Sequence, residues 1–177
     1  MKKTFFLLLL LITLIGCNGH YILDNPTDEN IKVYIDSTEY NLKPKEFIKV
    51  KLKTGNHTVS AEKNGTKILD NETFKIGDIP AGLINPTKND YVIYYIIYTK
   101  DSNLQNDFKP YEIDGKEIYS LLDSPEVTNG LFIEDRTLGK GNIDKNPPKT
   151  MKINGKYSFF MKIFRKDDFF KFYDEHM

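Results

Sequence analysis

The chain has 177 residues, of which 40% are hydrophobic, 13% aromatic and 28% charged, with 25 basic and 25 acidic side chains. The apolar share is too high for a disordered segment, and a nucleic-acid binder would need a basic excess to displace counterions from phosphates. We therefore expect a folded protein that binds no nucleic acid.

Residues 1–16 have the composition of a signal peptide. Lys2 and Lys3 give a positive start, and an apolar run follows from Phe5 to Ile15, broken by Thr13. The run is shorter than the roughly 20 residues of a membrane-spanning helix. It therefore predicts export and removal of the segment rather than a permanent span.

The end of this segment, Leu14-Ile15-Gly16-Cys17, resembles the lipobox of bacterial lipoproteins. The resemblance implies cleavage after Gly16, a lipid on the thiol of Cys17, and a short tether over residues 17–20. Several acyl chains would anchor the protein firmly, because each buried methylene contributes about 0.8 kcal/mol. The alternative is an ordinary secretory signal with a chance cysteine. Because Cys17 is the only cysteine, the mature chain has no disulfide.

The residue after the cysteine bears on location. Asn18 stands where an aspartate would resemble the signal for retention in the inner membrane. We therefore expect the outer membrane, with the protein facing the periplasm. In a bacterium with a single membrane, the protein would instead lie outside that membrane.

Residues 21–76 alternate apolar and polar side chains, which is typical of half-buried strands. Asn64-Gly65 predicts a hairpin turn that pairs Glu62 with Lys67 and Ala61 with Ile68. Short strands between turn residues predict a small antiparallel β-sandwich. The side chains expected to face inward are Ile31, Val33, Ile35, Val50, Leu52, Val59 and Phe74.

The same region resembles the PEGA-like surface module of envelope proteins. The resemblance rests on Asn25-Pro26-Thr27 and on strand-like runs at residues 31–36, 40–44 and 50–59. It implies a small β-sandwich without catalytic residues. Ser37-Thr38 replaces the glycine-rich turn of that pattern.

Residues 77–90 are expected to link this module to a second one, because they contain Gly77, Pro80 and Gly82. Asn85-Pro86-Thr87 repeats the earlier tripeptide, and we interpret both as turn chemistry. Residues 91–98 are rich in tyrosine and β-branched types and predict a central strand, with a buried helix as the competing assignment.

Residues 91–177 predict a second β-rich module with a C-terminal helix, so the whole chain is expected to be mainly β within the α+β class. Asp114-Gly115 favours a hairpin, although that register places Glu112 opposite Glu117. The alternative is a helix capped by Asp114.

The last 40 or so residues carry four further expectations. Residues 139–148 predict a mobile loop, and Asn154-Gly155 predicts a hairpin that pairs residues 151–153 with residues 157–164. Asp167 or Asp168 is expected to cap a final helix. The face of that helix that docks on the sheet is expected to hold Phe169, Phe172 and Tyr173.

The search for catalytic motifs yields no site. The three histidines, at positions 20, 57 and 176, are far apart in sequence, and we find no phosphate-binding glycine loop and no free thiol after lipidation. We therefore expect no enzyme activity, no cofactor, no metal site and no small-molecule substrate. His57, beside Gly55-Asn56, is interpreted as a satisfied turn residue rather than a ligand or base.

Partner contacts are predicted near the C-terminus. Phe170 lies off the apolar face of the last helix and is the best candidate for an exposed contact. Arg165 and Asp168 belong to a charge cluster that suits either a polar contact or solvated ion pairs, as does Glu134-Asp135-Arg136. The many aromatic residues of the second module are expected to pack in its core rather than to line a binding surface.

These observations lead to two functional hypotheses. The first is a non-enzymatic envelope lipoprotein, held to the membrane by its lipid, that binds or scaffolds another envelope protein. The alternative is a periplasmic immunity or inhibitor lipoprotein that neutralises a toxin or hydrolase.

Overall fold

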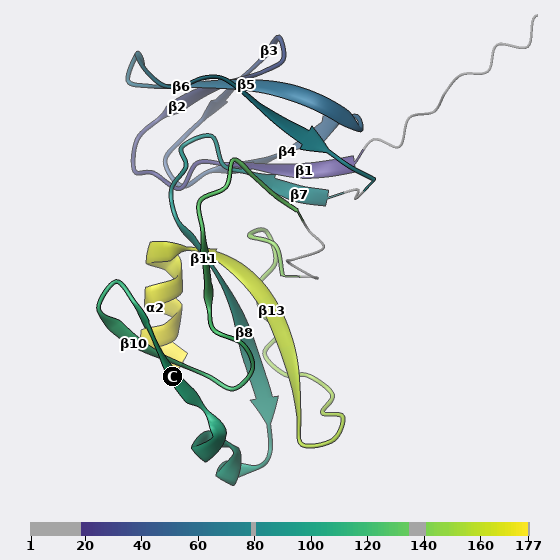
Figure 1. The fold of residues 1–177 in the computed structure, drawn as a ribbon, viewed down its shortest axis with the longest axis vertical. Coiled ribbons are helices and arrows are strands. Elements are labelled where there is room, and N and C mark those ends of the chain that lie inside the picture. The colour runs from purple at the N-terminus through teal and green to yellow at the C-terminus, as the bar shows by residue number, and fades with distance from the viewer. Residues whose placement is uncertain (1–18, 79–80, 135–140, 177) are drawn as a thin grey trace, which may run out of the picture.

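The computed structural model describes residues 19–78, 81–134 and 141–176. The predicted signal peptide with Gly16 and Cys17, and Asp135 and Arg136 of the second charge cluster, lie outside the described residues. The described chain is mainly β with a C-terminal helix, as expected, and none of its helices is long and apolar enough to cross a membrane. Figure 1 shows a sandwich at one end of an elongated molecule and a smaller sheet with the helix at the other.

Two four-stranded sheets form the sandwich. The first, in the order β3-β2-β5-β6, comprises β2 (Ile31–Ile35), β3 (Thr38–Leu42), β5 (Gly55–Lys63) and β6 (Thr66–Ile76). The second, in the order β12-β7-β1-β4, comprises β1 (Gly19–Asp24), β4 (Phe47–Leu52), β7 (Ala81–Ile84) and β12 (Phe132–Glu134). All neighbouring strands pair antiparallel except β1 and β7, which are parallel.

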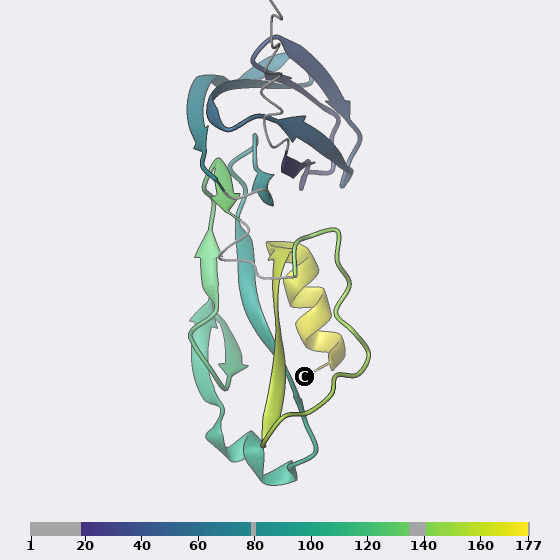
Figure 2. The ribbon, with the colours of Figure 1, turned by 90° about the vertical axis from the view of Figure 1, so that its right-hand side faces the viewer.

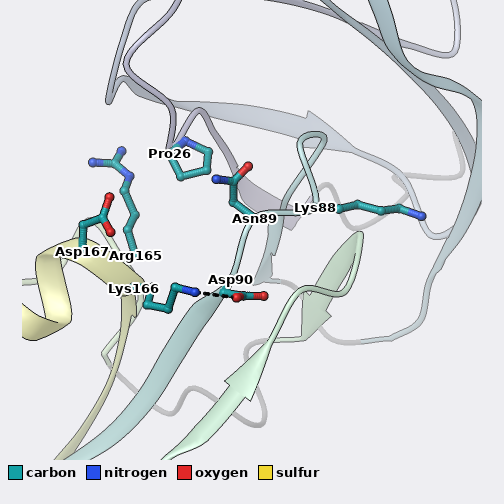
Figure 3. Close-up of a pocket in the computed structure, with 7 residues that line it drawn as sticks. All are labelled: Pro26, Lys88, Asn89, Asp90, Arg165, Lys166 and Asp167. Carbon is teal, nitrogen blue, oxygen red and sulfur yellow. Dashed lines mark hydrogen bonds and ion pairs between the residues drawn. The ribbon is translucent and has the colours of Figure 1, made fainter. Parts of the chain in front are cut away.

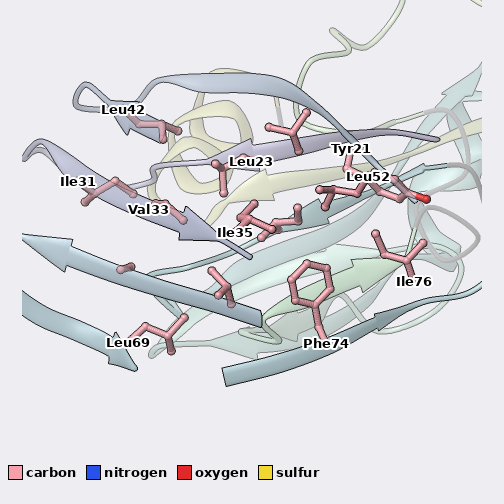
Figure 4. Close-up of a cluster of buried hydrophobic side chains, with 14 residues drawn as sticks. Tyr21, Leu23, Ile31, Val33, Ile35, Leu42, Leu52, Leu69, Phe74 and Ile76 are labelled. Carbon is pink, nitrogen blue, oxygen red and sulfur yellow. The ribbon is translucent and has the colours of Figure 1, made fainter. Parts of the chain in front are cut away.

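The predicted inward residues form the core between these sheets (Figure 4). All seven are buried, and Val33 and Val59 have no exposed surface. The strands bury alternate residues because successive side chains point to opposite faces of a sheet. Further members of the cluster are Tyr21, Leu23, Leu42, Ala61, Leu69, Ile76 and Ile84.

The Asn64-Gly65 hairpin forms with one correction to its register. Glu62 pairs with Lys67, as predicted, but a β-bulge next to this pair brings Ala61 opposite Leu69 rather than Ile68. The bulge places Leu69 in the core and leaves Ile68 39% exposed.

Two strands of the sandwich come from outside residues 21–76. The segment expected as a linker, residues 77–90, contains β7, and the expected second module supplies β12. Leu83 and Ile84 of β7 are fully buried, so this segment gains apolar burial by joining the sheet. Gly82 allows close packing rather than flexibility, because a Cβ there would lie 2.7 Å from ring atoms of Phe132.

The second sheet has three strands in the order β11-β8-β13. They are β8 (Tyr91–Thr99), β11 (Glu126–Thr128) and β13 (Tyr157–Arg165), and β8 is central, as predicted. A 3-10 helix, η1 (Ser102–Asp107), follows β8 and leads to the hairpin of β9 (Lys109–Ile113) and β10 (Lys116–Ser120). The helix α2 (Lys166–His176) follows β13 directly and lies alongside it (Figure 2).

The hairpin reading of Asp114-Gly115 is confirmed. Both residues have positive φ, 50° and 77°, as such a turn requires. Glu112 does pair with Glu117, so the fold contains the unfavourable like-charge pair that this register implies. Ile113 and Ile118 are buried in a cluster with residues of α2, and this burial outweighs a repulsion between exposed carboxylates.

Three expectations for the C-terminal region need correction. Residues 151–153 lie beside the start of β13 but form no strand, because the contacts run through a side chain: Ser158 Oγ donates to Lys152 O at 2.8 Å and accepts from Asn154 N at 3.2 Å. The helix begins at Lys166, so Asp167 and Asp168 lie in its first turn, where carboxylates interact favourably with the helix dipole, and do not precede it as caps. In the described part of the predicted loop, Gly141 is buried and its carbonyl accepts a hydrogen bond from Ile163 N at 2.8 Å.

Candidate functional site

A buried ion pair joins the sandwich to the second sheet. Arg165, at the end of β13, donates from Nη2 to Oδ1 of Asp24 at 2.6 Å and from Nε to Oδ2 at 3.0 Å. Asp24 ends β1 and has no exposed surface. The hydroxyl of Tyr91, at the start of β8, donates to the same carboxylate at 2.6 Å. Three strands therefore meet at one carboxylate.

The surroundings fix the protonation of this cluster. Burial opposes the charge of Arg165, but the hydrogen bonds and charge of Asp24 outweigh burial, so the pKa of the guanidinium rises. Burial, and then the charge of Asp24, raises the pKa of Tyr91 well above its ordinary value, which keeps its hydroxyl a donor. Arg165 Nη2 also donates to the carbonyl of Lys45 at 2.8 Å. The arrangement holds the two parts of the molecule together.

The two Asn-Pro-Thr tripeptides form neighbouring turns beside this cluster. Because β1 and β7 are parallel and Leu23 pairs with Ile84, the turns that follow the two strands emerge from the same edge. Asn25 accepts hydrogen bonds from the backbone N–H of Thr27 at 3.1 Å and from its hydroxyl at 2.7 Å. Asn85 accepts from the Thr87 hydroxyl at 3.2 Å. The predicted turn chemistry is therefore confirmed.

A polar cleft of about 330 Å³ opens between these turns and the start of α2 (Figure 3). Its lining consists of Pro26, Lys88, Asn89, Asp90, Arg165, Lys166 and Asp167. Lys166 Nζ lies 2.8 Å from Asp90 and 2.7 Å from Asp114, and these two hydrogen bonds raise the pKa of the lysine. Lys88 lies 2.6 Å from Glu72. Both ammonium groups are thus held in ion pairs that connect different segments of the chain. The charged groups of the cleft therefore serve to join these segments.

The three residues predicted as partner contacts differ in exposure and in role. Arg165 is 8% exposed and belongs to the buried ion pair, so it is not a surface contact. Asp168 is exposed and lies 3.5 Å from Arg165 Nη1. Phe170 is half-buried, with its ring centroid 5.7 Å from that of Phe169 and 5.3 Å from Nζ of Lys116 on β10. The prediction of an exposed Phe170 is wrong because the β9–β10 hairpin covers a second side of the helix.

His57 is a satisfied residue, as predicted, although it lies in β5 rather than in a turn. Its Nδ1 lies 2.9 Å from Asp36 Oδ2, and its Nε2 lies 2.7 Å from the carbonyl of Lys53. The ring therefore ties the β2–β3 turn to the start of β5.

One face of β8 and β13 is covered by α2, and the opposite face is covered only in part. The sandwich covers the part next to it, where Ile22, Leu83 and Ile133 cluster with Tyr91, Ile93 and Ile163. Further along the strands, the rings of Tyr95 and Phe159 meet at a centroid distance of 5.5 Å. Phe159 is 49% exposed, more than any other large apolar side chain in the described part of the chain.

We call the surface around Tyr95 and Phe159 the open face. Sequence reasoning assigned these residues to the core and missed the site. The alternation along β13 gave a partial indication, since Phe159 and Ile163 share one side of the strand. Which part of that side is covered depends on where β7 and β12 dock, and the local pattern does not contain this information. The chain matches no protein-family model, no curated protein and no solved structure.

Proposed function

We propose that this protein is a non-enzymatic cell-envelope protein, anchored through a lipid on Cys17, that binds another envelope protein through the open face. One observation supports the binding role above the others: Phe159 is 49% exposed beside Tyr95 on a sheet face that continues the core. Adjoining apolar side chains on a sheet face that no other element covers are typical of an interaction site.

The proposed anchor and the open face suit this role because they belong to opposite ends of the molecule. Cys17 precedes Gly19, the first residue of β1, by two residues, which span at most about 7 Å. The strand β1 lies in the sandwich, whereas β13 begins at Tyr157 at the far end of the elongated fold (Figure 1). An anchored protein of this shape would present its open face away from the membrane.

The anchor is tested by comparing the wild-type protein with Cys17→Ser in a bacterial host. We expect the wild type to incorporate labelled palmitate and to fractionate with membranes, and the variant to do neither. Label on the variant, or wild-type protein in the cytosolic fraction, would contradict the proposal.

The binding role is tested with a photo-crosslinking amino acid placed at position 159 in living cells. Position 68 is the matched control, because Ile68 is also apolar and exposed but lies on the sandwich. We expect a discrete protein adduct from position 159 and none from position 68. Equal adducts from the two positions, or no adduct from position 159, would refute binding through the open face.

A further inference from the structure

A cavity of about 520 Å³ lies beside the C-terminal end of α2, and we call it the aromatic pocket. Four segments of the chain line it: β8, the residue after η1, the loop around residue 147 and the end of α2 (Figure 2). Its lining includes Tyr98, Phe108, Pro147, Pro148, Phe172 and His176. The volume lies within the range of about 300–1,000 Å³ that small-molecule sites occupy.

The aromatic pocket and the open face lie on opposite sides of the second sheet. Tyr94 packs in one cluster with residues of α2, and Tyr98 shares its side of β8 because side chains alternate along a strand. Tyr95, which meets Phe159 on the open face, belongs to the other side. The inference drawn from the pocket therefore goes beyond the proposed function and does not depend on it.

Hydrogen bonds and ring contacts fix the walls of the pocket. The hydroxyl of Tyr98 donates to the carbonyl of Pro148 at 2.6 Å, which ties the loop to β8. Burial raises the pKa of Tyr98 and so keeps this hydroxyl protonated. The ring of His176 stacks on that of Phe172 with centroids 4.4 Å apart, and its Nδ1 donates to the Phe172 carbonyl at 2.8 Å. A pocket that is formed in advance lowers the entropic cost of binding.

The polar groups of the lining lie at the mouth of the pocket. Asn146, Lys149 and His176 are exposed, whereas the tyrosines, phenylalanines and prolines of the lining are buried or half-buried. Lys149 forms no ion pair with another described residue. The acidic residues that adjoin the lining in sequence, Asp107 and Glu175, are not part of it, and no other described acidic residue is. The charge at the mouth is therefore positive.

We propose that the aromatic pocket binds a small aromatic molecule that carries one carboxylate. The aromatic body would lie against the rings of Phe108, Phe172 and His176, because rings pack favourably in offset and edge-to-face arrangements. The carboxylate would stay at the mouth, where Lys149 supplies the opposite charge and the Asn146 amide a hydrogen-bond donor. Sequence reasoning predicted no small-molecule ligand, because the four segments meet only in the tertiary structure.

Two other ligand classes use only part of this arrangement. An aliphatic carboxylate would pair with Lys149 but would gain less from walls made of rings. A cation would gain from the aromatic faces and from the carbonyl groups at the end of α2, but Lys149 would repel it. An aromatic carboxylate uses both the rings and the charge.

The experiment uses the protein as purified from a bacterial host, in micelles of a neutral detergent, and follows binding by the chemical shifts of the protein amides. The probes are 2-naphthoate, 2-naphthamide, 2-naphthylmethylammonium and decanoate. We expect 2-naphthoate to shift the amides of Lys149, Phe172 and His176 in a saturable way, with a Kd of about 1 mM or lower. It should bind at least ten-fold more tightly than the ammonium probe and more tightly than decanoate.

Three variants separate the charge from the rings. Lys149→Glu should weaken 2-naphthoate at least ten-fold and leave the affinity for neutral 2-naphthamide unchanged. The matched control, Lys171→Glu, reverses an exposed lysine of α2 outside the pocket and should bind both probes as the wild type does. His176→Ala removes a ring from the wall and should weaken both naphthalene probes. All three side chains are exposed, so the variants are expected to fold.

Four results would overturn the inference. The first is the absence of saturable shifts in the pocket at about 5 mM 2-naphthoate. The second is equal or tighter binding of the ammonium probe, which would assign the pocket to cations. The third is tighter binding of decanoate, which would assign it to aliphatic acids. The fourth is equal weakening by Lys149→Glu and Lys171→Glu. None of these results bears on the lipid anchor or the open face.

Discussion

The buried pair of Arg165 and Asp24 allows a quantitative prediction. Replacing Arg165 with methionine keeps most of the side-chain volume and removes the charge. Asp24, which has no exposed surface, then loses its hydrogen bonds of 2.6 and 3.0 Å and, among the side chains of the described residues, keeps only the hydrogen bond from Tyr91. A buried carboxylate without its counterion is the main cost of this change.

Breaking a buried pair in this way costs about 3–5 kcal/mol, a large part of the 5–15 kcal/mol that stabilises an ordinary domain. With a urea m-value of about 2 kcal/mol/M, a loss of about 4 kcal/mol lowers the unfolding midpoint by about 2 M. Adding Asp24→Asn to Arg165→Met removes the buried carboxylate charge that the single variant leaves without a counterion. We therefore expect the double variant to be more stable than Arg165→Met alone.

The assay is urea unfolding followed by circular dichroism for the wild type, both single variants and the double variant. The control is Lys67→Met, which breaks an exposed pair with Asp70 at 3.0 Å, and exposed pairs contribute about 1 kcal/mol or less. If Arg165→Met costs no more than Lys67→Met, or if the double variant shows no recovery, the ion pair does not hold the two sheets together.

Two further predictions concern stability. Val33→Asp places a charge at a position with no exposed surface, so this variant should already be unfolded at 25 °C and show no cooperative unfolding transition. If the variant resisted proteases as the wild type does, Val33 would not face the core. Burial lowers the pKa of Lys162 to about 8, whereas the unfolded lysine has a pKa of about 10.4. Between these two pH values the unfolded state binds more protons than the folded state. The free energy of unfolding should therefore rise with pH in this range, by up to about 3 kcal/mol. Lys162→Met should lose this rise in denaturant titrations at pH 8 and 9.5, and an identical slope in the two proteins would refute the assignment.

The sequence by itself determined the local features of this protein. Period-two alternation identified the strands of residues 21–76 and their inward side chains, because a side chain on a strand can reach only one of two faces. Asn64-Gly65 and Asp114-Gly115 identified two hairpins, because few residues adopt positive φ at low cost. The apolar spacing of Phe169, Phe172 and Tyr173 identified the side of α2 that packs on the sheet, where Phe169 and Tyr173 are buried and Phe172 is half-buried.

Only the tertiary structure decided which segments meet. Asp24 and Arg165 form an ion pair although they are 141 residues apart in sequence. β7 and β12 belong to the sandwich, although the local pattern predicted that the sandwich ends at residue 76. Tertiary packing also reversed two predicted exposures: the β9–β10 hairpin covers Phe170, and the sandwich leaves Phe159 exposed. The physical reason is that a local pattern shows how apolar each side of a strand or helix is, whereas its exposure depends on which distant element packs against it.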